Sequence, residues 1–144
     1  MKQSFSNQAY ISFISWGLMI LYLSIGFIPN LDAVDKIAPQ WLAMSFLNLS
    51  SLIFLFAHRS FFFTAISKIL SSPLSITYIL FIAWAFFSVF YSINPTEVIV
   101  NISRQFNVLV MFIMMAIFLF SLQNKMKFIS WVVVVILGIE VYAV

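Results

Sequence analysis

The sequence contains no cysteine, one histidine and three glycines among its 144 residues. Without cysteine, neither a disulfide nor a thiolate metal site can form. With a single histidine, the usual clusters of metal ligands are also missing, and the chain has no Gly-rich phosphate loop and no Gly-x-Ser-x-Gly motif. We therefore expect no metal, no bound cofactor and no nucleic-acid partner.

Charged residues are equally scarce. Asp, Glu, Lys and Arg make up 8% of the chain, hydrophobic residues make up 64%, and the mean hydropathy is +1.12. A soluble domain has about 25% charged residues and roughly 45–50% apolar ones. A water-soluble fold cannot bury this much apolar surface, so the composition predicts an integral membrane protein.

The few charges occur in clusters, separated by uncharged stretches of spanning length. A helix needs about 20 mainly apolar residues to cross a hydrocarbon core of roughly 30 Å. Five segments meet this requirement: 9–28, 41–57, 74–91, 105–122 and 128–144. The predicted fold is all-α and polytopic, a single membrane domain with about five transmembrane helices.

The two ends of the chain carry further expectations. The first apolar segment exceeds the roughly 7–15 residues of a signal-peptide core and has no small-x-small cleavage pattern, which indicates a retained helix. The last segment, WVVVVILGIEVYAV, has no polar exit, although a final helix normally ends in residues that reach the headgroups. We therefore expect the fifth span to be truncated and to belong to a longer protein.

The basic residues favour one orientation. With the N-terminus in the cytoplasm, five basic residues lie inside and two lie outside, which agrees with the positive-inside rule; the inner ones are Lys2, Arg59, Lys68, Lys125 and Lys127. The first inner connection, 58–73, combines Phe61–Phe63 with Arg59 and Lys68. It fits either a short interfacial helix or a loop that dips its phenylalanines among the headgroups.

Arg104 is the strongest candidate for a functional residue, because charges at membrane depth usually face a cavity or a partner. It follows Glu97 by seven residues, so a helix through this region places both on one face. A guanidinium there can hold a diphosphate through two hydrogen bonds. The alternatives are an ion pair with Glu97 and snorkelling of Arg104 to phospholipid headgroups.

Glu140 is a second candidate. It lies about 13 residues into the fifth segment, or roughly 20 Å across the membrane. A role in a cavity or in helix pairing and a nearly solvated position at the outer interface both fit. Asp32, Asp35 and Lys36 are expected to form an ordinary solvated loop, and His58 is expected to make headgroup or helix-end contacts at the end of the second span.

Three stretches resemble the N-terminal region of the O-antigen ligase and polymerase family: FIPNLDAVDKIAPQW leading into MSFLNLSSL, WAFFSVFYSINPTEVIVNISR, and GIEVYAV. The likeness extends over essentially the whole chain and is greatest to Bacteroidetes-type members. It implies a larger enzyme of the bacterial inner membrane that transfers a glycan from an undecaprenyl-diphosphate carrier to a sugar acceptor, without a metal. The catalytic residues of that family lie downstream, so the resemblance assigns none here, and Arg104, Glu97 and Glu140 stand as candidate substrate contacts.

Two other classes of function remain open from the sequence. One is a complete small membrane protein that acts as a transporter or channel subunit, with Arg104 and Glu140 along its pathway. The other is a structural accessory subunit. Continuation of the coding sequence through further spans and a long outer loop would favour the enzyme.

Overall fold

The computed structural model describes the backbone of residues 2–29, 37–122 and 124–143, and the side chains of 9–29, 37–122 and 124–138. Within these residues all regular structure is helical. Four helical segments are long and apolar enough to cross a membrane: Ala9–Phe27, Ala38–Ala57, Pro73–Tyr91 and Pro95–Ser121. The protein is therefore an all-α, polytopic membrane protein, as the sequence predicted.

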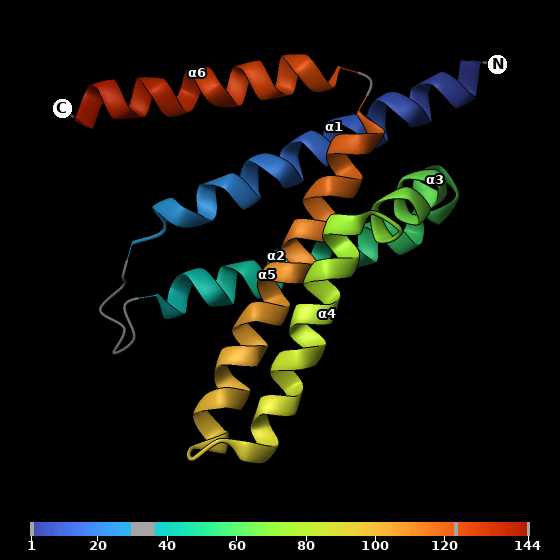
Figure 1. Ribbon diagram of the computed structural model, residues 1–144. Helices are drawn as coiled ribbons and strands as arrows, with labels where there is room; N and C mark the ends of the chain where they lie inside the picture. The colour runs from blue at the N-terminus through green and yellow to red at the C-terminus, as the bar shows by residue number, and fades with distance from the viewer. Residues whose placement is uncertain (1, 30–36, 123, 144) are drawn as a thin grey trace.

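The chain forms two antiparallel helix pairs that cross each other (Figure 1). The first pair is α1 (Lys2–Ser24), which continues into the 3-10 turn η1 (Ile25–Phe27), and α2 (Ala38–Ala57). The second pair is α4 (Pro73–Phe87), which continues into η2 (Ser88–Tyr91), and α5 (Pro95–Ser121). Helix α5 contacts α1, α2, α3 and α4, so it is the central helix of the bundle.

Each helix of the second pair begins at a polar residue that is followed by proline. The Ser72 hydroxyl accepts a hydrogen bond from the Ser75 amide at 3.3 Å, and Pro73 occupies the first turn of α4. Asn94 caps α5 in the same way, and Pro95 follows it. Both arrangements satisfy amides that a helix N-terminus leaves unpaired and use proline where it costs no hydrogen bond.

Helix α5 begins ten residues earlier than the span predicted at 105–122. The stretch after Asn94 is less apolar than the rest of the helix and therefore lies outside the span that hydropathy predicts. The cap at Asn94 and the acidic Glu97 in the first turn, where it complements the helix dipole, explain the early start. Arg104 consequently lies well inside a 27-residue helix rather than at its beginning.

The connection 58–73 contains a helix, α3 (Arg59–Leu70), which is one of the two forms expected for it. Phe62 is 0% exposed and packs against Phe118 of α5, with ring centroids 5.7 Å apart. Its neighbour Phe63 is 72% exposed. The phenylalanines therefore divide between the protein core and the outer surface, because successive residues of a helix point in different directions.

The fifth apolar segment forms α6 (Lys125–Ala143). It is anchored near its beginning, where the ring of Phe128 meets that of Trp16 edge to face at a centroid distance of 4.8 Å. The side chain of Glu140 lies outside the described residues, and so do Asp32, Asp35 and Lys36 of the first outer connection.

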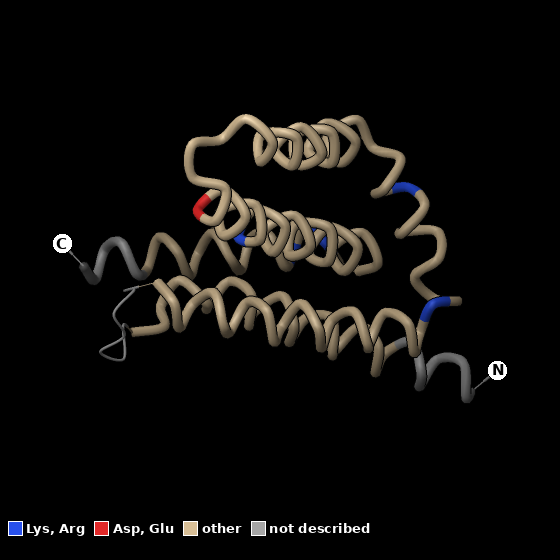
Figure 2. The backbone as a smooth tube through the Cα atoms, turned by 90° about the horizontal axis from the view of Figure 1, so that it is seen from below, with Lys and Arg blue, Asp and Glu red and all other residues tan. Residues whose placement is uncertain are grey.

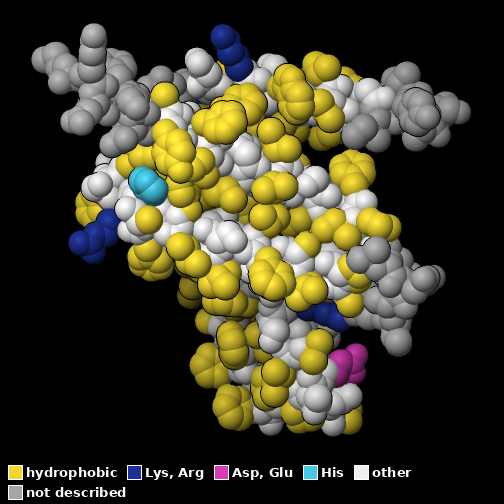
Figure 3. All heavy atoms as spheres, turned by 180° about the vertical axis from the view of Figure 1, so that it is seen from behind, with side chains coloured by type: hydrophobic (Ala, Val, Ile, Leu, Met, Phe, Trp, Pro, Cys, Tyr) yellow, Lys and Arg dark blue, Asp and Glu magenta, His cyan; other side chains and the backbone are white. Residues whose placement is uncertain are grey.

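The surface and the charges fit a bilayer. Hydrophobic side chains cover most of the face shown in Figure 3. Figure 2 shows basic positions toward the end of the bundle that holds α3, and an acidic position at the opposite end, where α4 leads into α5. Polar loops and charges at the ends of an apolar bundle are what a surrounding membrane requires.

Candidate functional site

Arg104 lies beside an aromatic ring on a neighbouring helix. Its guanidinium carbon is 5.8 Å from the ring centroid of Trp41, in the first turn of α2. Both side chains are half-buried. The distance is within the range of a cation–π contact, which orients a guanidinium over the ring face. Arg104 therefore lies at the contact between α2 and α5.

A groove of about 440 Å³ opens at this contact between α2 and α5. Its polar lining comes from Ser45, Ser103, Arg104 and Asn107, and its apolar lining comes from Ala38, Trp41, Leu42, Ile99 and Val100. These residues recur every three or four positions along each helix, so each set forms one continuous face. The groove combines one cation, two hydroxyls, one side-chain amide and an apolar wall.

A buried hydrogen-bond network continues from the groove into the bundle. Asn48 of α2 donates from Nδ2 to the side-chain oxygen of Asn107 on α5 and to its backbone oxygen, each at 3.0 Å. Tyr22 of α1 donates from its hydroxyl to Asn48 Oδ1 at 2.9 Å. The Tyr22 hydroxyl also lies 3.0 Å from that of Ser51. Three helices are therefore joined by polar contacts at membrane depth.

The network lies near the middle of a membrane-spanning helix. Asn48 is ten residues into α2, so it lies about 15 Å along a helix that crosses a core of roughly 30 Å. Polar groups at this depth are costly unless they are paired. Both side-chain amide protons of Asn48 are used, and its carbonyl oxygen accepts from Tyr22. Such pairing holds transmembrane helices in one register.

Trp41 has a polar atom that is not satisfied within the described residues. Its indole Nε1 is buried and meets no hydrogen-bond acceptor. Buried donors are nearly always paired, so an unpaired one on the wall of a groove needs an explanation.

Glu97 does not pair with Arg104 in the described part of the chain. Its backbone amide donates to Asn94 Oδ1 at 3.5 Å, and its carboxylate accepts from Asn94 Nδ2 at 3.3 Å. The two residues form a reciprocal cap at the beginning of α5. The ion pair that the sequence left open is thus replaced by a capping role for Glu97, which does not line the groove.

His58 has the structural role expected of it. It caps the C-terminal end of α2, with Nδ1 3.1 Å from the Phe54 carbonyl oxygen and its ring 4.8 Å from that of Phe54. Among the described residues, no three His, Cys, Asp or Glu side chains come close enough to hold a metal ion.

Sequence reasoning identified Arg104 but missed the residues that connect it to the bundle interior. The sequence alone assigned no role to Asn48, Asn107 or Tyr22. A usable signal exists, because Ser45, Asn48 and Ser51 share one face of α2 at spacings of three. Polar residues that recur on one face of a span indicate helix pairing or a cavity.

No family model, curated protein or solved structure matches the chain.

Proposed function

We propose that the chain is the N-terminal transmembrane part of a glycosyl-transferring membrane enzyme of the O-antigen ligase and polymerase type. Such an enzyme moves a glycan from an undecaprenyl-diphosphate carrier to a sugar acceptor. The observation that carries the proposal is the placement of Arg104 beside Trp41, in a groove between two membrane-spanning helices. The resemblance of the segments around Trp41 and Arg104 to that family supports it.

The groove suits a ligand that is part lipid and part anion. A planar guanidinium has five N–H donors, so Arg104 can bind two oxygens of a diphosphate while it stacks on an indole. The apolar wall formed by Leu42, Ile99 and Val100 suits a hydrocarbon chain. The side chains of Ser45 and Asn107 line the same groove as neighbouring polar groups. In this proposal Arg104 binds and orients the carrier, and other parts of the enzyme activate the acceptor.

The proposed location is the bacterial inner membrane, with the N-terminus in the cytoplasm. The excess of basic residues at the end that holds α3 supports this orientation, because lysine and arginine accumulate in cytoplasmic loops. The groove then lies toward the outer face, where Glu97 begins α5. Lipid-linked glycans in the outer leaflet would reach it by lateral diffusion.

A second candidate is a small transporter or channel subunit. The network of Tyr22, Asn48, Ser51 and Asn107 favours it, because polar side chains at membrane depth often line a substrate or ion pathway. The two candidates predict different behaviour in reconstituted vesicles. Vesicles that contain the purified chain would conduct ions or solutes, whereas the glycan-transfer proposal predicts no flux.

Substitution of Arg104 by lysine tests the proposal, because it keeps the charge and removes the planar donor set. The readout is glycan transfer to the acceptor in cells that carry the variant as their only copy, at matched protein amount. A charge-assisted hydrogen bond contributes about 1.5–3 kcal/mol, so transfer should fall roughly 10- to 150-fold.

Arg59→Lys is the matched control, because Arg59 is an exposed arginine outside the groove at the beginning of α3. It should leave transfer unchanged. Normal transfer by Arg104→Lys at normal abundance would exclude a role for Arg104 in binding the carrier, and equal losses in both variants would point to a general defect in folding or insertion.

A further inference from the structure

Two lysines from separate parts of the chain share one aromatic ring at the end of the bundle opposite the Arg104 groove. The ammonium of Lys68, on α3, lies 5.1 Å from the ring centroid of Phe120. The ammonium of Lys125, at the beginning of α6, lies 4.2 Å from the same centroid. Phe120 is near the end of α5. The tertiary structure therefore brings together two positive charges that are 57 positions apart in the sequence.

Among the described side chains, no acidic residue lies on the segments that form this end. The four acidic residues are Asp32, Asp35, Glu97 and Glu140, whereas the segments 58–73 and 121–130 contain basic residues and no acidic ones. Like charges repel, and the attraction of each ammonium to the Phe120 ring offsets only part of that repulsion. The remaining charge is complementary to an anion from outside the chain.

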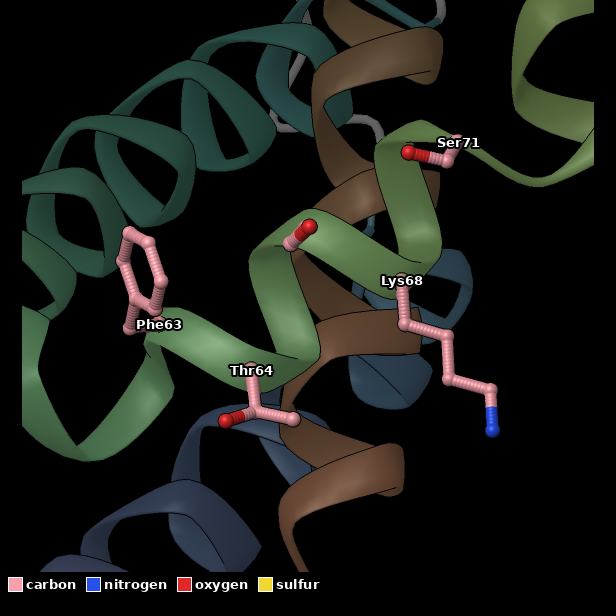
Figure 4. A pocket seen from close by; sticks show the side chains of 5 residues that line it. Phe63, Thr64, Lys68 and Ser71 are labelled. Carbon is pink, nitrogen blue, oxygen red and sulfur yellow. The ribbon is translucent and has the colours of Figure 1, made fainter.

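A shallow groove of about 500 Å³ lies on the outer face of α3, next to this pair of lysines. It is lined by Phe63, Thr64, Ser67, Lys68 and Ser71. Figure 4 shows Phe63 on one side of this face, Lys68 on the other and Thr64 between them. The groove thus has an aromatic side and a cationic side, with hydroxyl groups along the same helix face.

The hydroxyl groups of this groove differ from most others in the bundle. Those of Ser45, Thr77 and Ser103 donate to carbonyl oxygens of their own helices, at distances of 2.8–2.9 Å. Those of Thr64, Ser67 and Ser71 make no hydrogen bond to any residue that the structure describes. Their donors can therefore turn toward a ligand without breaking an existing bond.

We propose that this groove binds the headgroup phosphate of an anionic phospholipid. Lys68 and Lys125 provide the charge, the hydroxyls of Thr64 and Ser67 donate to phosphate oxygens, and an acyl chain lies along Phe63. A lipid fits better than a free anion because Phe63 is 72% exposed, and because α3 connects two spans and so lies at the depth of the headgroups. The proposal is independent of glycan transfer.

Spin-labelled lipids test the proposal on the full 144-residue chain. The chain is reconstituted in phosphatidylcholine vesicles that contain a small fraction of spin-labelled phosphatidylglycerol, and the fraction of motionally restricted label is measured. We expect the association of labelled phosphatidylglycerol with the chain to exceed that of labelled phosphatidylcholine roughly 25-fold, since each of the two lysines near the headgroup contributes about fivefold. Equal restriction of the two lipids would overturn the proposal.

Two variants distinguish a specific lipid-binding site from a general attraction of anionic lipids to positive charge. Lys68→Gln should lower the preference for phosphatidylglycerol roughly fivefold, whereas Lys127→Gln, which removes an exposed lysine of α6 outside the groove, should change it less than about twofold. Equal effects of the two changes would show that only the surface charge matters.

The double variant Thr64→Val and Ser67→Ala keeps every charge and removes two hydroxyls. It should lower the fraction of restricted phosphatidylglycerol about threefold or more, because each donor contributes a hydrogen bond to the phosphate. An unchanged fraction would also overturn the proposal. Inorganic phosphate, added in excess, should not displace the labelled lipid, and displacement would identify a site for a free anion instead.

Discussion

Asn48 on α2 and Asn107 on α5 are joined by two hydrogen bonds, both donated by the Asn48 side-chain amide at 3.0 Å. The Asn48 carbonyl oxygen accepts a third hydrogen bond, from Tyr22 of α1. One side chain near the middle of the membrane therefore sets the relative positions of three helices. Asn107 also lines the groove that contains Arg104, so the network and the groove share this residue.

Replacement of Asn48 by alanine should destabilise the bundle. The change removes the three hydrogen bonds of Asn48 and leaves Tyr22 with Ser51, and Asn107 with Ser45, as their remaining partners, so we expect a loss of about 1–3 kcal/mol in the free energy of unfolding. Equilibrium unfolding of the purified chain in mixed detergent micelles measures this. Ser50→Ala is the control, because the Ser50 hydroxyl is exposed and bonds only to Phe46 of its own helix. Equal stability of the two variants would contradict a central role for Asn48.

Phe62 and Phe63 offer a matched pair at adjacent positions of α3. Phe62 is 0% exposed against Phe118, so Phe62→Ala should leave a cavity and cost about 3–5 kcal/mol of unfolding free energy. Phe63→Ala removes the same atoms from a 72% exposed site and should cost far less. The same unfolding measurement compares them. A larger loss for Phe63→Ala would mean that α3 packs through its other face.

Asn94 should determine where α5 begins. Loss of its side chain in Asn94→Ala removes the cap and the contact with the Glu97 carboxylate, at a cost of about 1 kcal/mol. Hydrogen exchange of the amides from Glu97 to Val100 should become faster, while that of the helix centre stays the same. Asn101→Ala, an exposed position on the same helix, serves as the control. Unchanged exchange in Asn94→Ala would show that Pro95 alone sets the boundary.

The two ends of the bundle should be accessible from opposite sides of the membrane. The chain has no cysteine, so single cysteines at Ser71 and Glu97 can be labelled with an impermeant maleimide without further changes. In the proposed orientation, Glu97→Cys reacts from the outside of intact cells and Ser71→Cys reacts only after the membrane is opened. The reverse pattern would invert the orientation, and labelling of both positions from one side would contradict the helix arrangement.

The sequence by itself determined the fold class, because the fold class depends on composition. A chain with 8% charged residues and uncharged stretches of spanning length must satisfy its backbone hydrogen bonds inside helices when it lies in lipid. The ends of those helices could also be approximated, since Pro29, Pro73 and Asn94-Pro95 interrupt the apolar pattern. The beginning of α5 was missed because hydropathy measures lipid contact, whereas the cap at Asn94 extends the helix beyond the apolar stretch.

Only the tertiary structure decided which residues act together. The contact of Arg104 with Trp41, the three-helix network around Asn48 and the meeting of Lys68 with Lys125 over Phe120 all join parts of the chain that are far apart in sequence. Hydrophobic patterns indicate that a helix spans the membrane, but in a chain that is apolar on almost every face they do not indicate which face meets which neighbour. Close packing and the pairing of a few polar groups decide that, because lipid gives no preference of its own among apolar faces.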